Sequence, residues 1–463
     1  MKRSGFPLLA ASSLLLLTLS AQAGTRPQYG GTLQVSVHES PSSLDPNDMA
    51  KPGSLALRNI TNLIFETLVT MDDRGQVSPG LATSWSTEPI AGNQRWSFRL
   101  REGVMFHDGT ALTPAAAAAS LHSANPLWKI TSNADSVIVE CDSPCPYLPE
   151  ELSLVRNAIA KRSSDGKLSG TGPFRIADWQ PGKRLALGAE EDYWAGRPFL
   201  EAVNIEFGKS FRDQFVSLEL GKSDLIEIPA EQSHRISTAG MKMWRSEPLE
   251  LVALLFARDA QSPAEKSLRE ALALSVERAS IGSVILQGSG QPAATILPDW
   301  MTGYSIAFST ETDLARARQL RQEVRTPPLW AISYDSADPI AGLLAERIAL
   351  NARDGGVQVQ PAKSAASDLR LARMVLPPDP IMSLATVATA AGLPAPQINR
   401  DSAEDLYVAE REMLATEKLI PLFHLPVVYA ASPAVHGGLP RQDGMWNLAD
   451  VWLTRQQAGS GRP

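Results

Sequence analysis

The stretch that decides the fold of this chain is Trp96-Ser97-Phe98-Arg99-Leu100-Arg101-Glu102-Gly103-Val104-Met105-Phe106-His107-Asp108-Gly109-Thr110. Its first part alternates apolar and polar side chains, which predicts a half-buried strand over 96–101. Two turn dipeptides, Glu-Gly and Asp-Gly, then flank a short apolar run. Farther on, Thr113 and Pro114 are residue types that begin helices, so a capped helix is predicted through Leu121. These elements predict a scaffold and indicate no catalytic chemistry.

Segments on both sides of that stretch resemble one protein family in residue type and spacing. Pro79-Gly80-Leu81-Ala82 with Trp85 precedes it, and Gly170-Thr171-Gly172-Pro173-Phe174 and Ile420-Pro421-Leu422-Phe423-His424 follow it. The chain therefore resembles the extracytoplasmic solute-binding proteins of family 5, which serve peptide/nickel-type ABC importers. The resemblance implies an α/β fold: a two-lobed periplasmic binding protein of type II with an extra domain, as in dipeptide- and oligopeptide-binding proteins, built of mixed sheets flanked by helices.

The resemblance also implies how the chain divides into domains. The expected parts are a signal peptide (1–23), lobe I (24–57 with 168–252 and 426–463), an inserted domain (58–167) and lobe II (253–425). The inserted domain is expected to be reduced, because the segment between Ser123 and Ser169 is shorter than the corresponding part of the family.

The N-terminal residues have the pattern of an export signal. Lys2 and Arg3 precede an apolar run from Leu8 to Leu19, which is too short to cross a bilayer, and Ala21-Gln22-Ala23 forms a cleavage site. No cysteine follows that site, so no lipid anchor is expected, and a periplasmic location is predicted. The net charge of −7 gives no support for binding to nucleic acid.

Helical spacing predicts one helix over 57–69 and another that begins at Ser267 and is completed by 281–286. Short apolar runs predict strands over 251–256 and 420–424. The resemblance is thin over 123–169 and 380–402, and no element is assigned to the second of these stretches.

Two cysteines, Cys141 and Cys145, stand four positions apart. In an oxidising compartment a local disulfide is the leading interpretation, and free thiols are the alternative. A metal site is disfavoured, because two thiols without a nearby histidine or second cysteine pair fall short of four ligands.

The sequence offers no catalytic constellation. None of the six histidines has metal-ligand spacing, and there is no Gly-x-Ser-x-Gly motif. His107-Asp108 lies in a turn of the quoted stretch, where polar residues need no catalytic role. We therefore expect neither an enzyme nor a cofactor or metal.

Candidate ligand-binding residues come from aromatic content and from the resemblance. The chain has ten tryptophans, and large amphipathic rings suit a cleft lining. Trp85, Trp96 and Trp194 stand in structural motifs of the family and are expected in cores. The candidates for the cleft are Ser40, Trp300, Trp330, Tyr334, Leu376, Asp379 and Trp446.

One departure from the family bears on the ligand. Peptide-binding relatives carry a D-x-x-D/E-P motif whose first aspartate pairs with the free amine of the ligand. Here that position is Leu376, and Asp379 matches the second acid. Ala257, after Phe256, also stands where the family often has a ligand-contacting asparagine. We therefore expect no ordinary capture of a peptide by its amino terminus.

The resemblance implies a monomeric substrate-binding component of an ABC importer. Such a protein captures a peptide or related small solute in an interlobe cleft and delivers it to the permease subunits in the inner membrane. The alternative is a degenerate binding protein that acts as a sensor, chaperone or partner-binding module.

Overall fold

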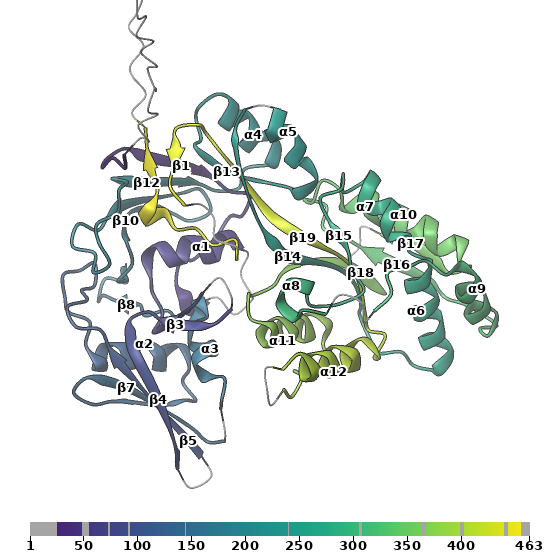
Figure 1. Ribbon diagram of the computed structural model, residues 1–463, viewed down its shortest axis with the longest axis horizontal. Coiled ribbons are helices and arrows are strands. Elements are labelled where there is room, and N and C mark those ends of the chain that lie inside the picture. Colours follow the sequence, from purple (N-terminus) through teal and green to yellow (C-terminus); the bar gives the residue numbers. More distant parts are fainter. Residues whose placement is uncertain are drawn as a thin grey trace, which may run out of the picture.

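The structure is a computed structural model that describes residues 26–48, 55–72, 75–90, 93–143, 145–238, 240–304, 308–362, 367–398, 402–438 and 443–454. The expected signal peptide, 1–23, lies outside the described residues. The described chain forms two lobes, with an additional domain below the first (Figure 1). This confirms the two-lobed α/β class, with mixed sheets flanked by helices.

A sheet of eleven strands runs through both lobes. Its main path is, in spatial order, β10 (Phe174–Gln180), β11 (Arg184–Ala189), β12 (Ala202–Glu206), β1 (Thr32–Ser36), β13 (Leu225–Ile228), β19 (Leu419–Ala431), β14 (Lys242–Phe256), β18 (Leu369–Val375), β16 (Leu329–Ser333) and β17 (Gln358–Ala362), with β15 (Gln291–Pro292) paired to β19. Lobe I also holds α4 (Phe211–Glu219), α5 (Ser233–Thr238), β20 (Val435–His436) and β21 (Trp452–Leu453).

Strands β14 and β19 pass from one lobe to the other (Figure 1). At its start β14 pairs with the end of β19, which also pairs with β13 in lobe I. From Glu250 onward β14 pairs with β18 in lobe II. The register between the two long strands shifts on both sides of Pro248. Both strands extend well beyond the predicted 251–256 and 420–424. In β14 the predicted run marks the fully buried part, whereas β19 is buried almost throughout, as far as Ala431.

The inserted domain is built on a four-stranded sheet of β4 (Ala82–Ile90), β5 (Asn93–Leu100), β7 (Ser136–Cys141) and β6 (Lys129–Ser132). Strand β5 and the predicted helix cap are confirmed: Thr113 Oγ1 accepts a hydrogen bond from the Ala116 N–H at 3.1 Å, and Pro114 begins α2 (Pro114–Ala124). The domain also contains α3 (Leu148–Leu152) and the short pairs β2 (Val69–Met71) with β3 (Val77–Pro79) and β8 (Lys161–Arg162) with β9 (Leu168–Ser169).

The prediction of a helix through Val69 is wrong. Helix α1 (Leu55–Ile64) ends at Ile64, whose carbonyl accepts a hydrogen bond from the Gly172 N–H at 3.0 Å. A Cβ atom at Gly170 would lie only 1.9 Å from the same carbonyl oxygen, so the close approach requires glycine there. Buried residues of α1 belong to the core of lobe I, whereas the core of the inserted domain begins at Leu68. Residue 58, where the inserted domain is expected to begin, lies within α1.

Both faces of β14 are buried in lobe II. Val252 and Leu254 join the core under α6 (Pro263–Ser275), α7 (Arg278–Val284), α9 (Leu314–Gln322) and α10 (Ala341–Asp354). Leu251 and Ala253 face α8 (Asp299–Thr302), α11 (Pro380–Ala391) and α12 (Ala403–Leu414). The predicted continuous helix from Ser267 is two helices, because the chain leaves the helical region at Val276. Helix α11 occupies the stretch where no element was expected.

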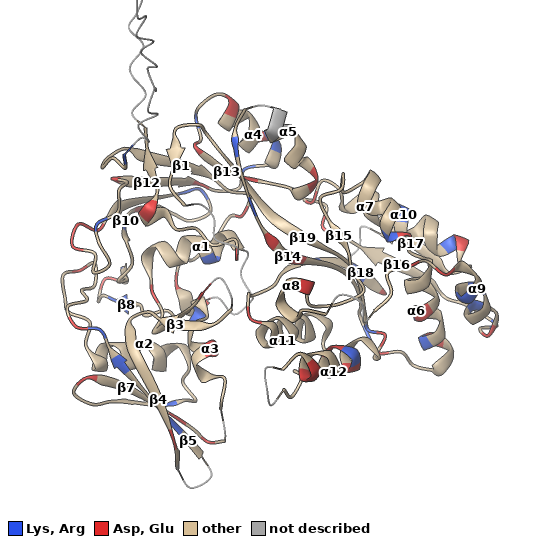
Figure 2. Cartoon of the chain, viewed as in Figure 1, with Lys and Arg blue, Asp and Glu red and all other residues tan. Residues whose placement is uncertain are grey.

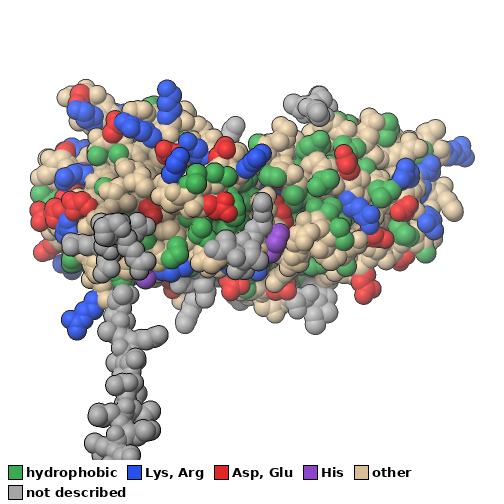
Figure 3. Space-filling model, turned by 90° about the horizontal axis from the view of Figure 1, so that it is seen from above, with side chains coloured by type: hydrophobic (Ala, Val, Ile, Leu, Met, Phe, Trp, Pro, Cys, Tyr) green, Lys and Arg blue, Asp and Glu red, His purple; other side chains and the backbone are tan. Residues whose placement is uncertain are grey.

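No helix among the described residues is long and apolar enough to cross a membrane. Acidic and basic side chains are interspersed over both lobes in the space-filling view (Figure 3).

Candidate ligand-binding cavity between the lobes

A cavity of about 360 Å³ lies where lobe I and the inserted domain face lobe II. Lobe II contributes Pro377, Pro378, Asp379 and Met382, which lie at the start of α11. The opposite wall is formed by residues of α1 and the segment after it, the β2–β3 hairpin and three later segments, among them Arg58, Asn62, Glu66, Thr70, Met71, Leu154, Tyr193, Trp194, Asp443, Met445 and Trp446. This volume is at the lower end for small-molecule sites, which suits a small solute.

Glu66 is a charged group of this wall, and hydrogen bonds hold it in place. Its carboxylate accepts hydrogen bonds from Thr171 Oγ1 at 2.8 Å, from the Tyr193 hydroxyl at 2.8 Å and from Trp194 Nε1 at 3.0 Å. Burial raises the pKa of Glu66, and these three donors act in the opposite direction. Since the donors come from segments more than one hundred residues away in sequence, Glu66 ties the chain just after α1 to two later segments of the cavity wall.

Arg58 is a cation of the same wall; the residue as a whole is half-buried, and part of its guanidinium is fully buried. It is the single basic residue of α1 and appears as the blue segment of that helix in Figure 2. Its Nε and Nη2 atoms are buried, and no described residue accepts a hydrogen bond from either. Burial lowers the pKa of Arg58, while Tyr429 and Asp443 nearby act to raise it. The guanidinium therefore retains unused donors inside the cavity wall.

The neighbouring residue of α1 fixes the C-terminal segment against the cavity. Asn59 is fully buried and donates to the Tyr429 hydroxyl at 3.1 Å, while its Oδ1 accepts from the Trp446 N–H at 2.8 Å. The Trp446 and Tyr429 rings meet edge to face at 5.7 Å. An aromatic wall is thereby held rigidly beside Arg58.

The lobe II wall is built on the beginning of α11. Asp379 caps that helix, accepting a hydrogen bond from the Met382 N–H at 2.6 Å, and is 6% exposed. At Gly75, a Cβ atom would lie 2.8 Å from the Pro378 carbonyl oxygen, so the β2–β3 turn touches lobe II directly. Met71, Met382 and Met445 add flexible apolar side chains that adapt to different ligand shapes.

The structure places two of the seven candidate residues, Asp379 and Trp446, on this cavity. Leu376 lies beneath it, 1% exposed in the apolar core of α11 and α12. A leucine is favoured at this position because its surroundings are apolar. Nothing at residue 376 could pair with a ligand amine.

The other four candidates lie elsewhere. Trp330 is 2% exposed in the core of lobe II, where its ring meets Phe256 edge to face at 5.1 Å. Tyr334 packs against the same core. Trp300 donates through Nε1 to the Pro248 carbonyl at 2.9 Å, and Ser40 is exposed and donates to the Gly182 carbonyl at 2.8 Å. None of these four residues lines the interlobe cavity.

Several residues of the cavity were not foreseen from the sequence. Arg58 and Tyr193 attracted no prediction, and Trp194 was assigned to a core. Glu66 stands in the segment Ile64-x-Glu66-x-Leu68-Val69, and an acid between apolar residues was the available signal. Its partners are distant in sequence, so only the folded chain shows that Trp194 and Glu66 share a wall.

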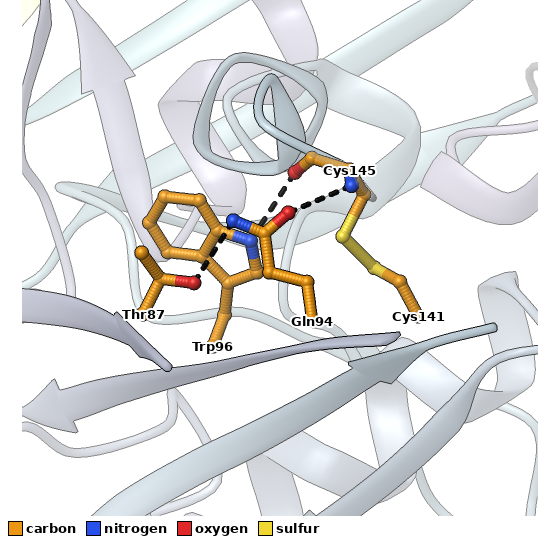
Figure 4. The surroundings of a disulfide bond; sticks show 5 residues. All are labelled: Thr87, Gln94, Trp96, Cys141 and Cys145. Atoms are coloured by element: carbon orange, nitrogen blue, oxygen red, sulfur yellow. Dashed lines mark hydrogen bonds between the residues drawn. A yellow bond between two sulfur atoms is a disulfide. The ribbon is translucent and has the colours of Figure 1, made fainter. Parts of the chain in front are cut away.

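The structure joins Cys141 and Cys145 in a disulfide (Figure 4). Gln94 Oε1 accepts a hydrogen bond from the Cys145 N–H at 2.8 Å, and Trp96 Nε1 donates to the Cys145 carbonyl at 3.2 Å. These contacts hold the loop against the inserted sheet. Beside it a second hollow, of about 580 Å³, continues the interface between the inserted domain and α11.

No cluster of three or more histidine, cysteine, aspartate or glutamate side chains that could hold a metal ion occurs among the described residues. The cavity instead offers one partly buried cation, hydrogen-bonded carboxylates and apolar walls. These features suit binding of an organic solute.

Comparison with known proteins identifies relatives of this chain. The family model for bacterial extracellular solute-binding proteins, family 5 (middle), matches residues 76–374. The nickel-binding protein NikA of Staphylococcus aureus is 24% identical over 330 residues, which cover 68% of this chain and 65% of that relative. The match thus spans just under two thirds of the relative's length.

Two solved structures share the fold. The oligopeptide-binding protein AppA of Bacillus subtilis, in complex with a nonapeptide, has a TM-score of 0.75 at 16% identity, covering 93% of this chain and 100% of that one. NikA of Brucella suis, in complex with Fe(III)-EDTA, has a TM-score of 0.77 at 19% identity, covering 92% and 100%.

Proposed function

Because this chain belongs to family 5 of the bacterial extracellular solute-binding proteins, we propose that it is the solute-binding component of an ABC importer. In this role it captures a peptide or related small solute between its lobes and delivers it to permease subunits in the membrane. The family is extracytoplasmic, and we propose that residues 1–23 direct the chain to the periplasm, where it acts as a monomer without a lipid anchor.

The observation that carries this proposal is the interlobe cavity. Its walls come from both lobes, with Asp379 and Met382 on one side and Arg58 and Glu66 on the other. A solute bound there contacts both lobes at once, so it stabilises the state in which they are closed. The two strands that join the lobes, β14 and β19, are the natural place for the bend.

The relatives point to a broad range of solutes. The printed descriptions name a nonapeptide for AppA and Fe(III)-EDTA for NikA of Brucella suis. Leu376 offers no charge for a ligand amine, so a peptide held by its amino terminus in the usual way fits this chain poorly. We propose a small solute that is recognised by other groups.

Native mass spectrometry of protein purified from periplasm tests the proposal, together with small-angle scattering before and after removal of co-purified solute. We expect a bound small molecule, and a radius of gyration that increases when it is removed. Thr70→Trp, which fills the cavity from the exposed side of β2, should abolish both effects. Thr131→Trp, on the exposed edge strand β6, is the matched control.

If no small molecule co-purifies and no solute changes the scattering, the transport role is refuted. The alternative, a degenerate binding protein that acts as sensor, chaperone or partner module, would then be favoured. Leu376 and Ala257, where relatives carry polar ligand contacts, are the observations that support this second candidate.

A further inference from the structure

We propose that the solute carries a carboxylate or another oxyanion and that Arg58 is the residue that binds it. The inference rests on the proposed solute-binding function and deepens it by naming the chemical class of the ligand. It starts from the buried, unused donors of Arg58 on the wall of the interlobe cavity.

The guanidinium of Arg58 is in a costly position, because two of its nitrogens have no hydrogen-bond acceptor among the described residues. Its Nε and Nη2 atoms are buried, and no described residue accepts a hydrogen bond from them. A buried charge without hydrogen-bond partners is strongly unfavourable. Asp443 and Tyr429 act on Arg58 through charge, without a hydrogen bond to those two atoms. A ligand acceptor would therefore remove a cost that the unliganded protein carries.

The carboxylates of the same cavity are engaged by the protein itself. Glu66 accepts from Thr171, Tyr193 and Trp194. Asp379 accepts from the backbone of its own helix, and Asp443 Oδ1 accepts from the Met445 N–H at 2.9 Å. The unused donors of this wall thus belong to a cation. An anionic ligand group would complete the hydrogen bonds of Arg58, whereas a cationic group would be repelled by its guanidinium.

Arginine is suited to this task. Its planar fork of N–H groups matches the two oxygens of a carboxylate or phosphate and binds them as a pair. Arg58 projects from α1, whose next residue, Asn59, is fully buried and bonded to Tyr429 and Trp446. The helix therefore holds the backbone of Arg58 in a fixed place beside the cavity. The apolar remainder of the solute would lie against Met382, Met445 and Trp446.

The test uses citrate, L-glutamate, L-histidine and trialanine, each compared with its methyl ester or amide. Binding to solute-free protein is measured by calorimetry and thermal shift in wild type, Arg58→Gln and Arg58→Lys. We expect at least one acid to bind wild type and its neutralised form to bind at least about 30-fold more weakly. Arg58→Gln should lower the affinity for that acid by a similar factor, because losing one partner of a buried charge pair is costly.

Arg58→Lys keeps the charge but loses the two-pronged geometry, and we expect an intermediate loss. Arg212→Gln, at an exposed position of α4 outside the cavity lining, is the matched control and should keep binding within a few-fold. Far-ultraviolet circular dichroism checks that each variant is folded.

The inference is overturned if esters bind as well as acids, if Arg58→Gln keeps full affinity, or if none of the four acids binds. The outcome that refutes this inference differs from the one that refutes the proposed function. A neutral or cationic solute that binds and closes the lobes would leave the solute-binding role intact and refute only the oxyanion class.

Discussion

Pro248 and Pro426 face each other across the two long strands that join the lobes. Neither residue has a backbone N–H, so the ladder of hydrogen bonds between β14 and β19 is interrupted at this pair. The register also shifts on both sides of Pro248. The interruption falls between the part of β14 that serves lobe I and the part that pairs with β18, which is where the proposed bend between the lobes would occur.

A side chain replaces the missing ladder bonds near this pair. Ser246 Oγ, 6% exposed, accepts a hydrogen bond from the Val427 N–H at 2.9 Å. Ser246→Ala leaves that N–H without its partner, and we expect the free energy of unfolding to fall by about 1–3 kcal/mol. Urea denaturation measures the change. Ser283→Ala, at an exposed position in α7, is the control and should change it by less than about 0.5 kcal/mol; equal losses in both variants would contradict the role of Ser246.

The buried carboxyl group of Glu227, on β13, leads us to expect that the free energy of unfolding depends on pH. Burial raises its pKa to about 7, although its carboxylate accepts a hydrogen bond from the His38 N–H at 2.6 Å. An acid whose folded pKa exceeds its unfolded value contributes stability at low pH, and this contribution is lost as pH rises from about 4.5 through about 7. We expect a loss of at most about 3 kcal/mol across that window.

Glu227→Gln removes the titration and keeps an acceptor for His38. The difference in unfolding free energy between variant and wild type should therefore grow as the pH rises from 5 to 7.5, in favour of the variant. Glu219→Gln, on the exposed side of α4, serves as the control. A difference that stays constant across this range would show that Glu227 does not titrate there.

The disulfide is expected to make a modest contribution. Cys141 and Cys145 close a short loop, and the loss of chain entropy in the unfolded state corresponds to about 2 kcal/mol. Dithiothreitol should therefore lower the free energy of unfolding by that amount or less. The double variant Cys141→Ser/Cys145→Ser should start at the lower value and show no response to reductant. A response in that variant would mean that the reductant acts elsewhere.

Replacing Leu376 by the aspartate of peptide-binding relatives should destabilise the protein and should not create peptide binding. Leu376 is 1% exposed among apolar side chains, so Leu376→Asp buries a carboxylate without a partner. We expect a loss of about 3–5 kcal/mol in unfolding free energy and no gain in affinity for trialanine. Leu376→Met, which keeps the volume, should lose less than about 1.5 kcal/mol. Tight, amine-dependent peptide binding by Leu376→Asp would disprove this account.

The sequence predicted much of the scaffold because its signals are local. Strand β5 and the cap at Thr113 follow from side-chain alternation and from residue type at one helix end. The length of α1 was predicted wrongly, because its end depends on Gly170 and Gly172, which meet Ile64 only in the folded chain. Helix α11 was missed although Asp379 and Pro380 have the residue types of a helix start.

The candidate site was predicted less well. Asp379 and Trp446 lie on the cavity, as predicted. Trp330, predicted in the cleft because of its large ring, is buried in a core instead. A large aromatic side chain fits both places, and no local pattern separates them. Arg58 was missed because a lone basic residue on a helix is normally solvated. The groups that act on its charge, Tyr429 and Asp443, come from the far end of the chain.

By itself, the sequence determined the family and the two-lobed α/β class, since motif spacing and hydrophobic periodicity act over a few residues at a time. It also determined that residue 376 carries no charge for a ligand amine. Only the tertiary structure decided which side chains share the cavity: Glu66 meets Trp194, and two nitrogens of Arg58 are buried without an acceptor among the described residues. The physical reason is that burial and hydrogen bonding depend on segments that are distant in sequence and meet only when the lobes assemble.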